Sequence, residues 1–530
     1  MVASFKKYNR FNYRFDDLFS CKAGLAIPFR YWEVLPGDVW KFTHIPLARM
    51  QALVSPAFGE VVVRLNTFFV PHRIVWPEFY EGFMIPKLND DGTLDTATMP
   101  TITKTWDVGS LGDYLGFPTG VPFTSDAMII RAYQKIIRDW YLNTMIEDEY
   151  DISISTAGGE DTTTSTDLFH VNYPRDYYTG CTPSKLRGPQ VTLPLGDAAP
   201  VYTMNGRAIT VEGREPAALQ WYDLVSERTY GIQNGQSVDL VLTGGSQNVG
   251  YTNTKLNNEG TVLSHNIVPS NLFADMSQAV GLHPDEFRLA FQVNQKLIMD
   301  MRGGSRTVDW LKEHYGVNCS DARLQRSEFL GGSKSFFNVS EVLQTSATGT
   351  TPQGNMAGHG FSVFNTPTRT KTFEEHGYVI CILSIVPKAM YMNGAPRSAL
   401  KRSPEEYGLP VLSHSIQDAV FKGQVNWTGT DADLQPFGYR PIYDEYRHMY
   451  SKVHGQFKTT LDDWHWARKF DGVQSLNKDF IEVNESEIDR PFATDAELPN
   501  ADHFLVNVKT IARAHRRLPK VGVEGLIDHK

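Results

Sequence analysis

The amino-acid sequence predicts a mainly β fold, an antiparallel sandwich of Greek-key or jelly-roll type with long loop insertions and several packing helices. Residues 61–70 (VVVRLNTFFV) alternate between apolar and polar side chains, as in a strand with one buried face. Residues 378–386 (YVICILSIV) are continuously apolar, which is typical of a strand covered on both faces. Weaker alternation occurs at 39–45 and 504–513. Strands near both termini favour sheets that combine distant parts of the chain.

The first helical pattern lies at residues 125–146, and Ser125 is positioned to cap it. Its apolar stripe predicts a packing helix, with Arg131 on the opposite, polar side. The following segment, 155–167 (STAGGEDTTTSTD), is polar and nearly free of large apolar groups. We therefore expect it to form a surface loop.

A second helical pattern begins at Pro284 and stops before Gly303. Pro suits the first turn of a helix, and the acidic residues that follow it favour a helix N-terminus. The apolar stripe includes Phe287 and Phe291. This pattern predicts a second packing helix.

The composition is that of an ordered chain without a membrane-spanning segment. Of its 530 residues, 41% are hydrophobic and 21% are charged, which argues against wholesale disorder. The N-terminus has no apolar run suited to a signal peptide, and no later stretch is apolar enough to cross a bilayer. We therefore expect cytoplasmic synthesis and no membrane insertion. The cysteines are far apart and are expected to be free, mostly buried thiols: Cys21, Cys181, Cys319 and Cys381.

Basic residues gather at the two ends of the chain. The first thirty residues carry a formal charge of +4 and the last thirty +3, which leaves −16 on residues 31–500 from the total of −9. The candidates for contact with a polyanion are Lys6, Lys7, Arg10, Arg14, Arg513, Arg516 and Arg517. The aromatic residues between the first group could stack on unpaired bases or dock this arm onto a neighbouring subunit: Tyr8, Phe11, Tyr13 and Phe15. The simpler alternative is that both ends are merely solvated.

The segment 301–333 is rich in arginine and is bracketed by two Gly-Gly pairs. It contains a short amphipathic helix that ends at Gly316, a residue type suited to a positive φ. No nucleophile–base pair or phosphate loop occurs in it. We interpret it as a scaffold junction whose arginines form salt bridges within or between subunits: Arg302, Arg306, Arg323 and Arg326.

Reactive groups in the spacing of an enzyme are absent from the sequence. No HExxH, GxSxG or EF-hand pattern occurs, and His454, Asp462, Asp463 and His465 match no usual zinc arrangement. We expect no catalytic site, metal or cofactor. The alternative from another class is a β-sandwich carbohydrate-binding protein or glycoside hydrolase, which requires aromatic platforms and two carboxylates at a fixed separation.

Several ordered blocks carry a family resemblance. They include RGGSR (302–306), SDARLQRSEFLGGS (320–333), FNYRFDDLF (11–19), LPGDVWKFTHIPLARM (35–50), VTLPLG (191–196), TPQGNMAG (351–358), FEEHGY (373–378) and GLIDH (525–529). Together they resemble the major capsid protein of gokushoviruses, single-stranded DNA phages of the family Microviridae. The resemblance spans nearly the whole chain and lapses mainly around 150–170 and 197–270.

The resemblance implies a viral jelly roll, with many copies forming a T=1 icosahedral shell around a circular single-stranded DNA genome. It implies assembly in the bacterial host cytoplasm with a small basic DNA-binding protein, an internal scaffolding protein and a pilot protein. The chain would then comprise 1–196 (arm and first part of the jelly roll), 197–270 (a loop insertion) and 271–530 (the remainder with the basic C-terminal segment). The alternative for the insertion is a solvated loop without a partner.

In the family, three copies of the insertion meet as a protrusion at each threefold axis, where they are thought to contact a host surface receptor. The candidate host-contact residues here are polar or aromatic: Asn234, Gln247, Asn248, Tyr251 and Asn253.

Overall fold

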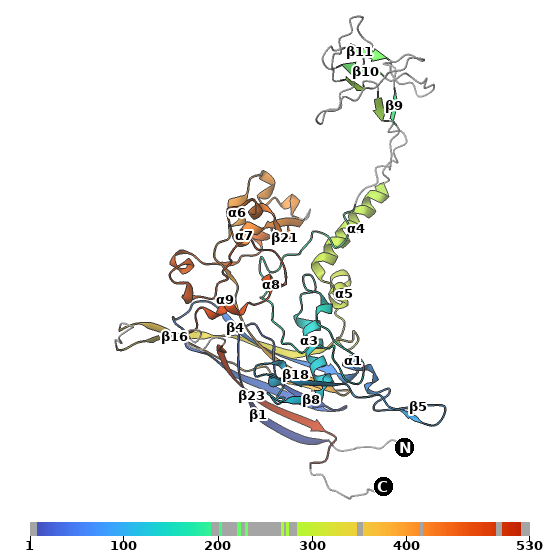
Figure 1. The fold of residues 1–530 in the computed structure, drawn as a ribbon, viewed down its shortest axis with the longest axis vertical. Helices are drawn as coiled ribbons and strands as arrows, with labels where there is room; N and C mark the ends of the chain where they lie inside the picture. The colour runs from blue at the N-terminus through green and yellow to red at the C-terminus, as the bar shows by residue number, and fades with distance from the viewer. Residues whose placement is uncertain are drawn as a thin grey trace. The chain divides into compact units, whose positions relative to one another are not determined.

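The computed structural model describes most of the chain (Figure 1). The described residues are 8–191, 201–203, 220–223, 228–231, 267–269, 272–274, 284–346, 353–413, 417–493 and 501–520. The chain divides into two compact units: Met1–Arg187 with Ile298–Lys530, and Gly188–Leu297. The predicted host-contact residues, together with Lys6 and Lys7, lie outside the described residues.

Two antiparallel sheets form the body of the larger unit. The first sheet has the order β1 (Asn9–Cys21), β23 (Phe504–Arg516), β3 (Val39–Met50), β16 (Met356–Val363) and β15 (Asn338–Leu343), with β17 (Arg369–Thr372) also paired to β3. The second sheet has the order β14 (Glu328–Phe336), β4 (Val61–Pro71), β18 (Gly377–Pro387) and β2 (Ile27–Val34). The chain crosses repeatedly between the sheets, and this strand order confirms the predicted jelly roll.

Long insertions connect some of these strands. Between β4 and β14 lie α1 (His72–Val75), β5 (Lys87–Leu88), β6 (Leu94–Asp95), β7 (Thr101–Thr105), α2 (Leu111–Tyr114), β8 (Pro122–Asp126), α3 (Ala127–Ile136), the π-helical turn η2 (Ile137–Tyr141), α4 (Pro284–Gly303) and α5 (Thr307–Tyr315). Between β18 and β23 lie β19 (Met390–Tyr391), α6 (Arg397–Leu400), β20 (Gln417–Phe421), α7 (Lys422–Val425), β21 (Pro436–Pro441), β22 (Ser451–Lys452), α8 (Lys478–Ile481) and α9 (Glu485–Asp489).

The smaller unit contains short antiparallel strands within the first of these insertions. Strand β10 (Gln220–Asp223) pairs with both β11 (Arg228–Gly231) and β12 (Ile267–Pro269), and β9 (Val201–Thr203) pairs with β13 (Leu272–Ala274). Most of α4 also belongs to this unit.

The strand patterns read from the sequence correspond to burial in the structure. On β4 the predicted inward residues are buried, whereas Arg64 and Asn66 are partly exposed. All eleven residues of β18 are buried, because the other sheet covers one face and the inserted helix α3 packs on the other. Both strand predictions are confirmed. Three of the four cysteines, Cys21, Cys181 and Cys381, are buried free thiols, as expected.

Helix α3 corrects three details of the prediction. Asp126, not Ser125, caps it by accepting a hydrogen bond from the Met128 amide. The helix ends with η2 at Tyr141 and does not reach residue 146. Arg131 is fully buried rather than solvent-facing, because its Nε donates to Asp161 Oδ2 at 2.7 Å. The segment 155–167 is an irregular loop whose residues are mostly exposed, as expected, and the buried Asp161 anchors it over the helix.

The two helices around residue 300 are both largely exposed. Helix α5 ends at Gly316, whose φ of 67° is the left-handed conformation expected there. Phe287 and Phe291 of α4 are 51% and 67% exposed in the single chain. Among the described residues of α4 only Met301 is buried. The prediction of a packing helix is therefore wrong for the first part of α4.

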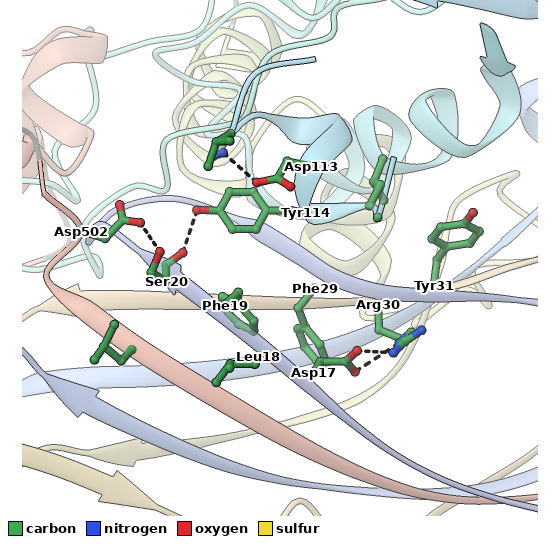
Figure 2. A pocket seen from close by; sticks show the side chains of 15 residues that line it. Asp17, Leu18, Phe19, Ser20, Phe29, Arg30, Tyr31, Asp113, Tyr114 and Asp502 are labelled. Carbon is green, nitrogen blue, oxygen red and sulfur yellow. Dashed lines mark hydrogen bonds and ion pairs between the residues drawn. The ribbon is translucent and has the colours of Figure 1, made fainter. Parts of the chain in front are cut away.

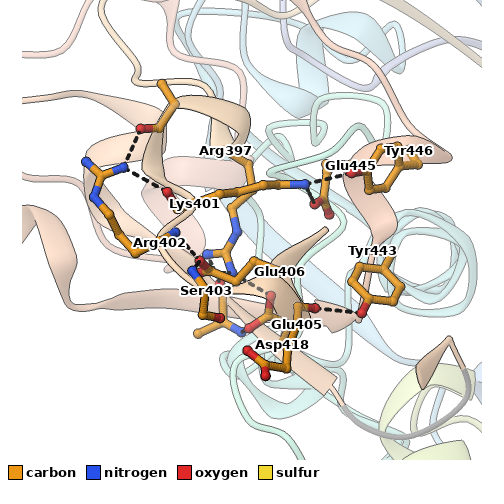
Figure 3. A network of polar contacts seen from close by, with 12 residues as sticks. Arg397, Lys401, Arg402, Ser403, Glu405, Glu406, Asp418, Tyr443, Glu445 and Tyr446 are labelled. Atoms are coloured by element: carbon orange, nitrogen blue, oxygen red, sulfur yellow. Dashed lines mark hydrogen bonds and ion pairs between the residues drawn. The ribbon is translucent and has the colours of Figure 1, made fainter. Parts of the chain in front are cut away.

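The second insertion is held together by buried charges paired within it (Figure 3). Arg397 Nη2 lies 2.7 Å from Asp418 Oδ2, and only 8% of the arginine side chain is exposed. Lys401 Nζ lies 3.0 Å from Glu445 Oε1 and 2.9 Å from the Tyr446 hydroxyl. Because removing one partner would leave a buried charge unpaired, these contacts favour one arrangement of the loop.

Between the sheets, His44 occupies an apolar position on β3. Its Nδ1 lies 2.9 Å from Thr510 Oγ1, and only 1% of the residue is exposed. Burial lowers the pKa of His44 from 6.5 to about 4. The ring is therefore neutral in the folded chain at pH values where an unfolded chain would protonate it.

The first prediction concerns acid stability. Because the unfolded state binds the extra proton, the His44 contribution to the free energy of unfolding is lost as the pH falls from 6.5 toward about 4. A shift of this size corresponds to about 3 kcal/mol. Urea unfolding of dissociated subunits should show a shallower acid dependence for His44→Gln than for the unchanged chain. The exposed His359→Gln is the control, and equal acid dependence in all three proteins would contradict this assignment.

Candidate nucleic-acid interface

Strand pairing brings the two ends of the chain onto one surface. Strand β23 lies between β1 and β3, and Figure 1 shows the first strand and the last strand side by side. Arg10 lies opposite His515, and Arg513 lies between Asn12 and Lys41. Residues that face each other across an antiparallel sheet project from the same side. Their exposure shows that this side points away from the sandwich interior.

This surface is strongly basic, and we call it the basic face. On β1, β23 and β3, its charged residues are Arg10, Arg14, Lys41, Arg49, Lys509 and Arg513, with Asp16 as the one carboxylate. Lys41 and Arg513 lie directly opposite each other. Like charges in such positions destabilise a sheet by roughly 0.2–1 kcal/mol, so an external anion would relieve this repulsion.

Two of the predicted DNA-contact residues have other positions. Arg516 alternates to the interior side, where its Nε donates to Asp38 Oδ2 at 2.7 Å and its guanidinium lies 5.0 Å from the Trp40 ring centroid. Arg517 lies over the Tyr8 ring at 5.0 Å. The charge of Arg516 is thus balanced within the chain. Of the predicted residues that the structure describes, Arg10, Arg14 and Arg513 lie on the basic face.

The aromatic residues of β1 also alternate to the interior. The Tyr13 ring stacks on Trp40 with centroids 5.3 Å apart, and the Arg30 guanidinium lies over Phe15 at 4.5 Å. Phe11 is likewise partly buried on this side. The Tyr13 and Phe15 rings are therefore engaged within the chain, on the side away from the basic face, which argues against base stacking by these two.

Sequence reasoning missed Lys41, Arg49 and Lys509. The period-2 patterns at 39–50 and 504–516 place each of them on a polar side of its own strand. That pattern marks them as surface residues, but it does not mark them as DNA contacts. Their common location depends on the pairing of β23 with β3, which the patterns do not encode.

A hollow lies between β1, β2 and α2, at the part of β1 that contains residues 17–20 (Figure 2). Asp17 is paired with Arg30, and Asp502 accepts a hydrogen bond from Ser20. Asp113 accepts a hydrogen bond from the Gly109 amide at 2.8 Å. Burial raises the pKa of Asp17, with Arg30 opposing the shift. Each carboxylate therefore has a structural partner.

The arginine-rich junction divides into two pairs. Arg306 Nη2 donates to the carbonyls of Arg138 and Leu142 at 2.7 and 2.9 Å. Arg326 Nη2 donates to the Asp139 carbonyl at 2.6 Å. Both arginines therefore hold the end of the α3–η2 helix within the chain. The other two are exposed, namely Arg302 and Arg323.

The described residues contain no group of three or more His, Cys, Asp or Glu residues placed to hold a metal ion. Likewise, none of their helices combines the length and apolar character needed to cross a bilayer.

Comparison with known proteins identifies the family. The model of the capsid protein (F protein) family matches residues 6–526. The chain belongs to this family. It is 29% identical to capsid protein VP1 of Spiroplasma virus 4 over 527 residues, which cover 95% of this chain and 92% of the relative.

Two further relatives have the same description. Capsid protein VP1 of Chlamydia phage 1 is 28% identical, covering 94% of this chain and 92% of that protein. Capsid protein VP1 of Bdellovibrio phage phiMH2K is 30% identical, covering 89% and 86%. These matches confirm the resemblance to gokushovirus capsid proteins.

Family membership settles the class of function. The chain is a structural protein of a phage capsid that assembles with itself into a shell, and its place is the virion. It is not an enzyme, and the carbohydrate-binding or glycoside hydrolase alternative is not favoured.

The second prediction separates the structural arginine from the exposed one. Arg516→Gln removes an ion pair with Asp38, whose side chain is 1% exposed, and should lower the free energy of unfolding by about 2 kcal/mol. Arg513→Gln should change it by less than about 0.5 kcal/mol, because this side chain is exposed. Urea unfolding of both variants measures the difference. Equal destabilisation would show that the two positions were assigned wrongly.

Proposed function

We propose that this chain is the major capsid protein of a T=1 icosahedral shell, with the basic face lining the interior against a circular single-stranded DNA genome. The observation that carries the proposal is the charge of that face, set against an acidic chain with a net charge of −9. Such a contrast gives the subunit two electrostatically different sides. A phosphate backbone is the polyanion that a shell must enclose.

Contact with DNA in this proposal is electrostatic and independent of base sequence. Lys and Arg displace condensed counterions from phosphates, which makes affinity fall as salt rises. The rigid sheet holds the cations at strand spacing without the ordering cost of a flexible arm. Lys6, Lys7 and Arg517 would extend the contact beyond the sheet. A small basic DNA-binding protein would bind part of the genome as well.

The third prediction concerns the salt dependence of this contact. Replacing Arg10, Arg14 and Arg513 with Gln should reduce the slope of log affinity against log salt by about 2 for an unstructured single strand. Fluorescence anisotropy of labelled oligothymidine with dissociated subunits measures the slope. The matched control replaces exposed cations elsewhere: Lys185, Lys388 and Arg402. If both triple variants keep the original slope, the basic face is not the DNA contact.

Shell contacts are the second part of the proposal. Icosahedral symmetry repeats each contact around the shell, so modest interactions accumulate. Arg302 and Arg323 are exposed beside the junction that Arg306 and Arg326 hold within the chain. We assign the exposed pair to salt bridges with neighbouring subunits, and the inner pair to the geometry of the junction.

The fourth prediction tests this division. Arg302→Ala with Arg323→Ala should weaken each contact by about 1 kcal/mol, or roughly fivefold, and reduce the yield of shells. The unfolding midpoint should stay unchanged, whereas Arg306→Ala should lower it. Electron microscopy and light scattering measure shell yield and size. Full yield from the double variant would exclude these two residues from subunit contacts.

The remaining parts concern the outside of the particle and its assembly. Residues 197–270 would form a threefold protrusion that contacts a host receptor through Asn234, Gln247, Asn248, Tyr251 and Asn253. Support comes from the position of this segment in an insertion between two jelly-roll strands, within a compact unit of its own. Assembly would occur in the host cytoplasm with an internal scaffolding protein and a pilot protein.

A further inference from the structure

A second positively charged feature lies on the opposite sheet of the sandwich. It is a pocket of about 430 Å³ on the outward side of β4. This size lies within the range of about 300–1,000 Å³ that is typical of small-ligand sites. One wall is the turn η2 and the residues that follow it, and the other is the segment 171–179. Strand β14 and the start of α5 complete the lining with Phe329 and Arg306.

Three arginines line this pocket and no Asp or Glu does. Among the described residues, Arg64 and Arg175 form no ion pair. Arg306 is oriented by its hydrogen bonds to the carbonyls of Arg138 and Leu142. Guanidinium groups that share a concave site without a carboxylate favour a bound anion, and their planar donors suit the oxygens of phosphate.

The rest of the lining suits a flat ring. Phe68, Trp140 and Phe329 form one cluster, with Phe329 centroids 5.4 Å from Phe68 and 5.5 Å from Trp140. Phe329 itself is 44% exposed, so it is accessible to a ligand. Aromatic side chains of this kind bind nucleic-acid bases irrespective of their sequence.

We propose that this pocket binds a nucleoside 5′-monophosphate. The arginines bind the phosphate, and the base lies against the Phe329 cluster. This site goes beyond the proposed DNA contact, because the basic face lies on the other sheet. The ligand is either a free nucleotide or an unpaired nucleotide within a strand.

The fifth prediction is tested by calorimetric titration of dissociated subunits with adenosine 5′-monophosphate. Adenosine and inorganic phosphate should each bind at least about tenfold more weakly, because each offers only part of the ligand. Phosphate that binds as tightly as the nucleotide would overturn the nucleoside assignment. No binding of the nucleotide would overturn the site.

Variants locate the binding. Arg64→Gln with Arg175→Gln should weaken the nucleotide by at least about tenfold, and exposed Arg175→Gln alone should weaken it without affecting folding. The Arg10, Arg14 and Arg513 triple variant should keep the original affinity, so failure here and failure of the basic face are distinguishable. Unchanged affinity in both pocket variants would contradict the proposal. If a trinucleotide competes with adenosine 5′-monophosphate, the ligand is a nucleotide within a strand. If it does not compete, the ligand is the free nucleotide.

Discussion

The pairing of β23 between β1 and β3 is the constraint on which the rest of the structure depends. It joins residues 9–21 and 39–50 to residues 504–516, nearly the full length of the chain apart. Without the last strand, β1 would have no partner in the first sheet. Pairing strands so far apart in sequence first costs the entropy of closing a very long loop, and the free energy of burial is gained only afterwards. The sandwich therefore closes only when the C-terminal strand is in place.

The same pairing serves stability and charge distribution together. One side of β23 contributes Phe504, Val506 and Val508 to the core, and the other side contributes Arg513 to the basic face. The period of two along a strand separates these roles residue by residue. Arg516 shows how strictly the separation applies, because it lies three residues from Arg513 and projects to the other side, onto Asp38.

The insertions cover the second sheet and do not disturb this arrangement. Helix α3 packs on the outward side of β4 and β18, and the Arg131–Asp161 pair draws a polar loop over the helix. Arg306 and Arg326 hold the end of the helix by donating hydrogen bonds to carbonyls of its last turn and of Leu142. The pocket proposed for a nucleotide is built from these parts. The basic face therefore depends on strand pairing in the first sheet, whereas the pocket depends on the insertions that cover the second sheet.

The sequence by itself determined the strands, the packing helix α3, the family and the general location of positive charge. Alternation on β4 and continuous burial on β18 follow from local patterns, because the period of a strand is written in consecutive residues. The basic ends were visible from charge counts, and so were Arg10, Arg14 and Arg513 as candidates.

Tertiary structure decided which of these residues share a surface. Lys41, Arg49 and Lys509 join the basic face only through register, while Phe11, Tyr13 and Phe15 leave it. Register between strands more than 450 residues apart is set by burial of the whole sheet, which no local pattern specifies. The local pattern likewise predicted that Arg131 faces solvent, because it does not show that Asp161 pairs with this arginine in the core.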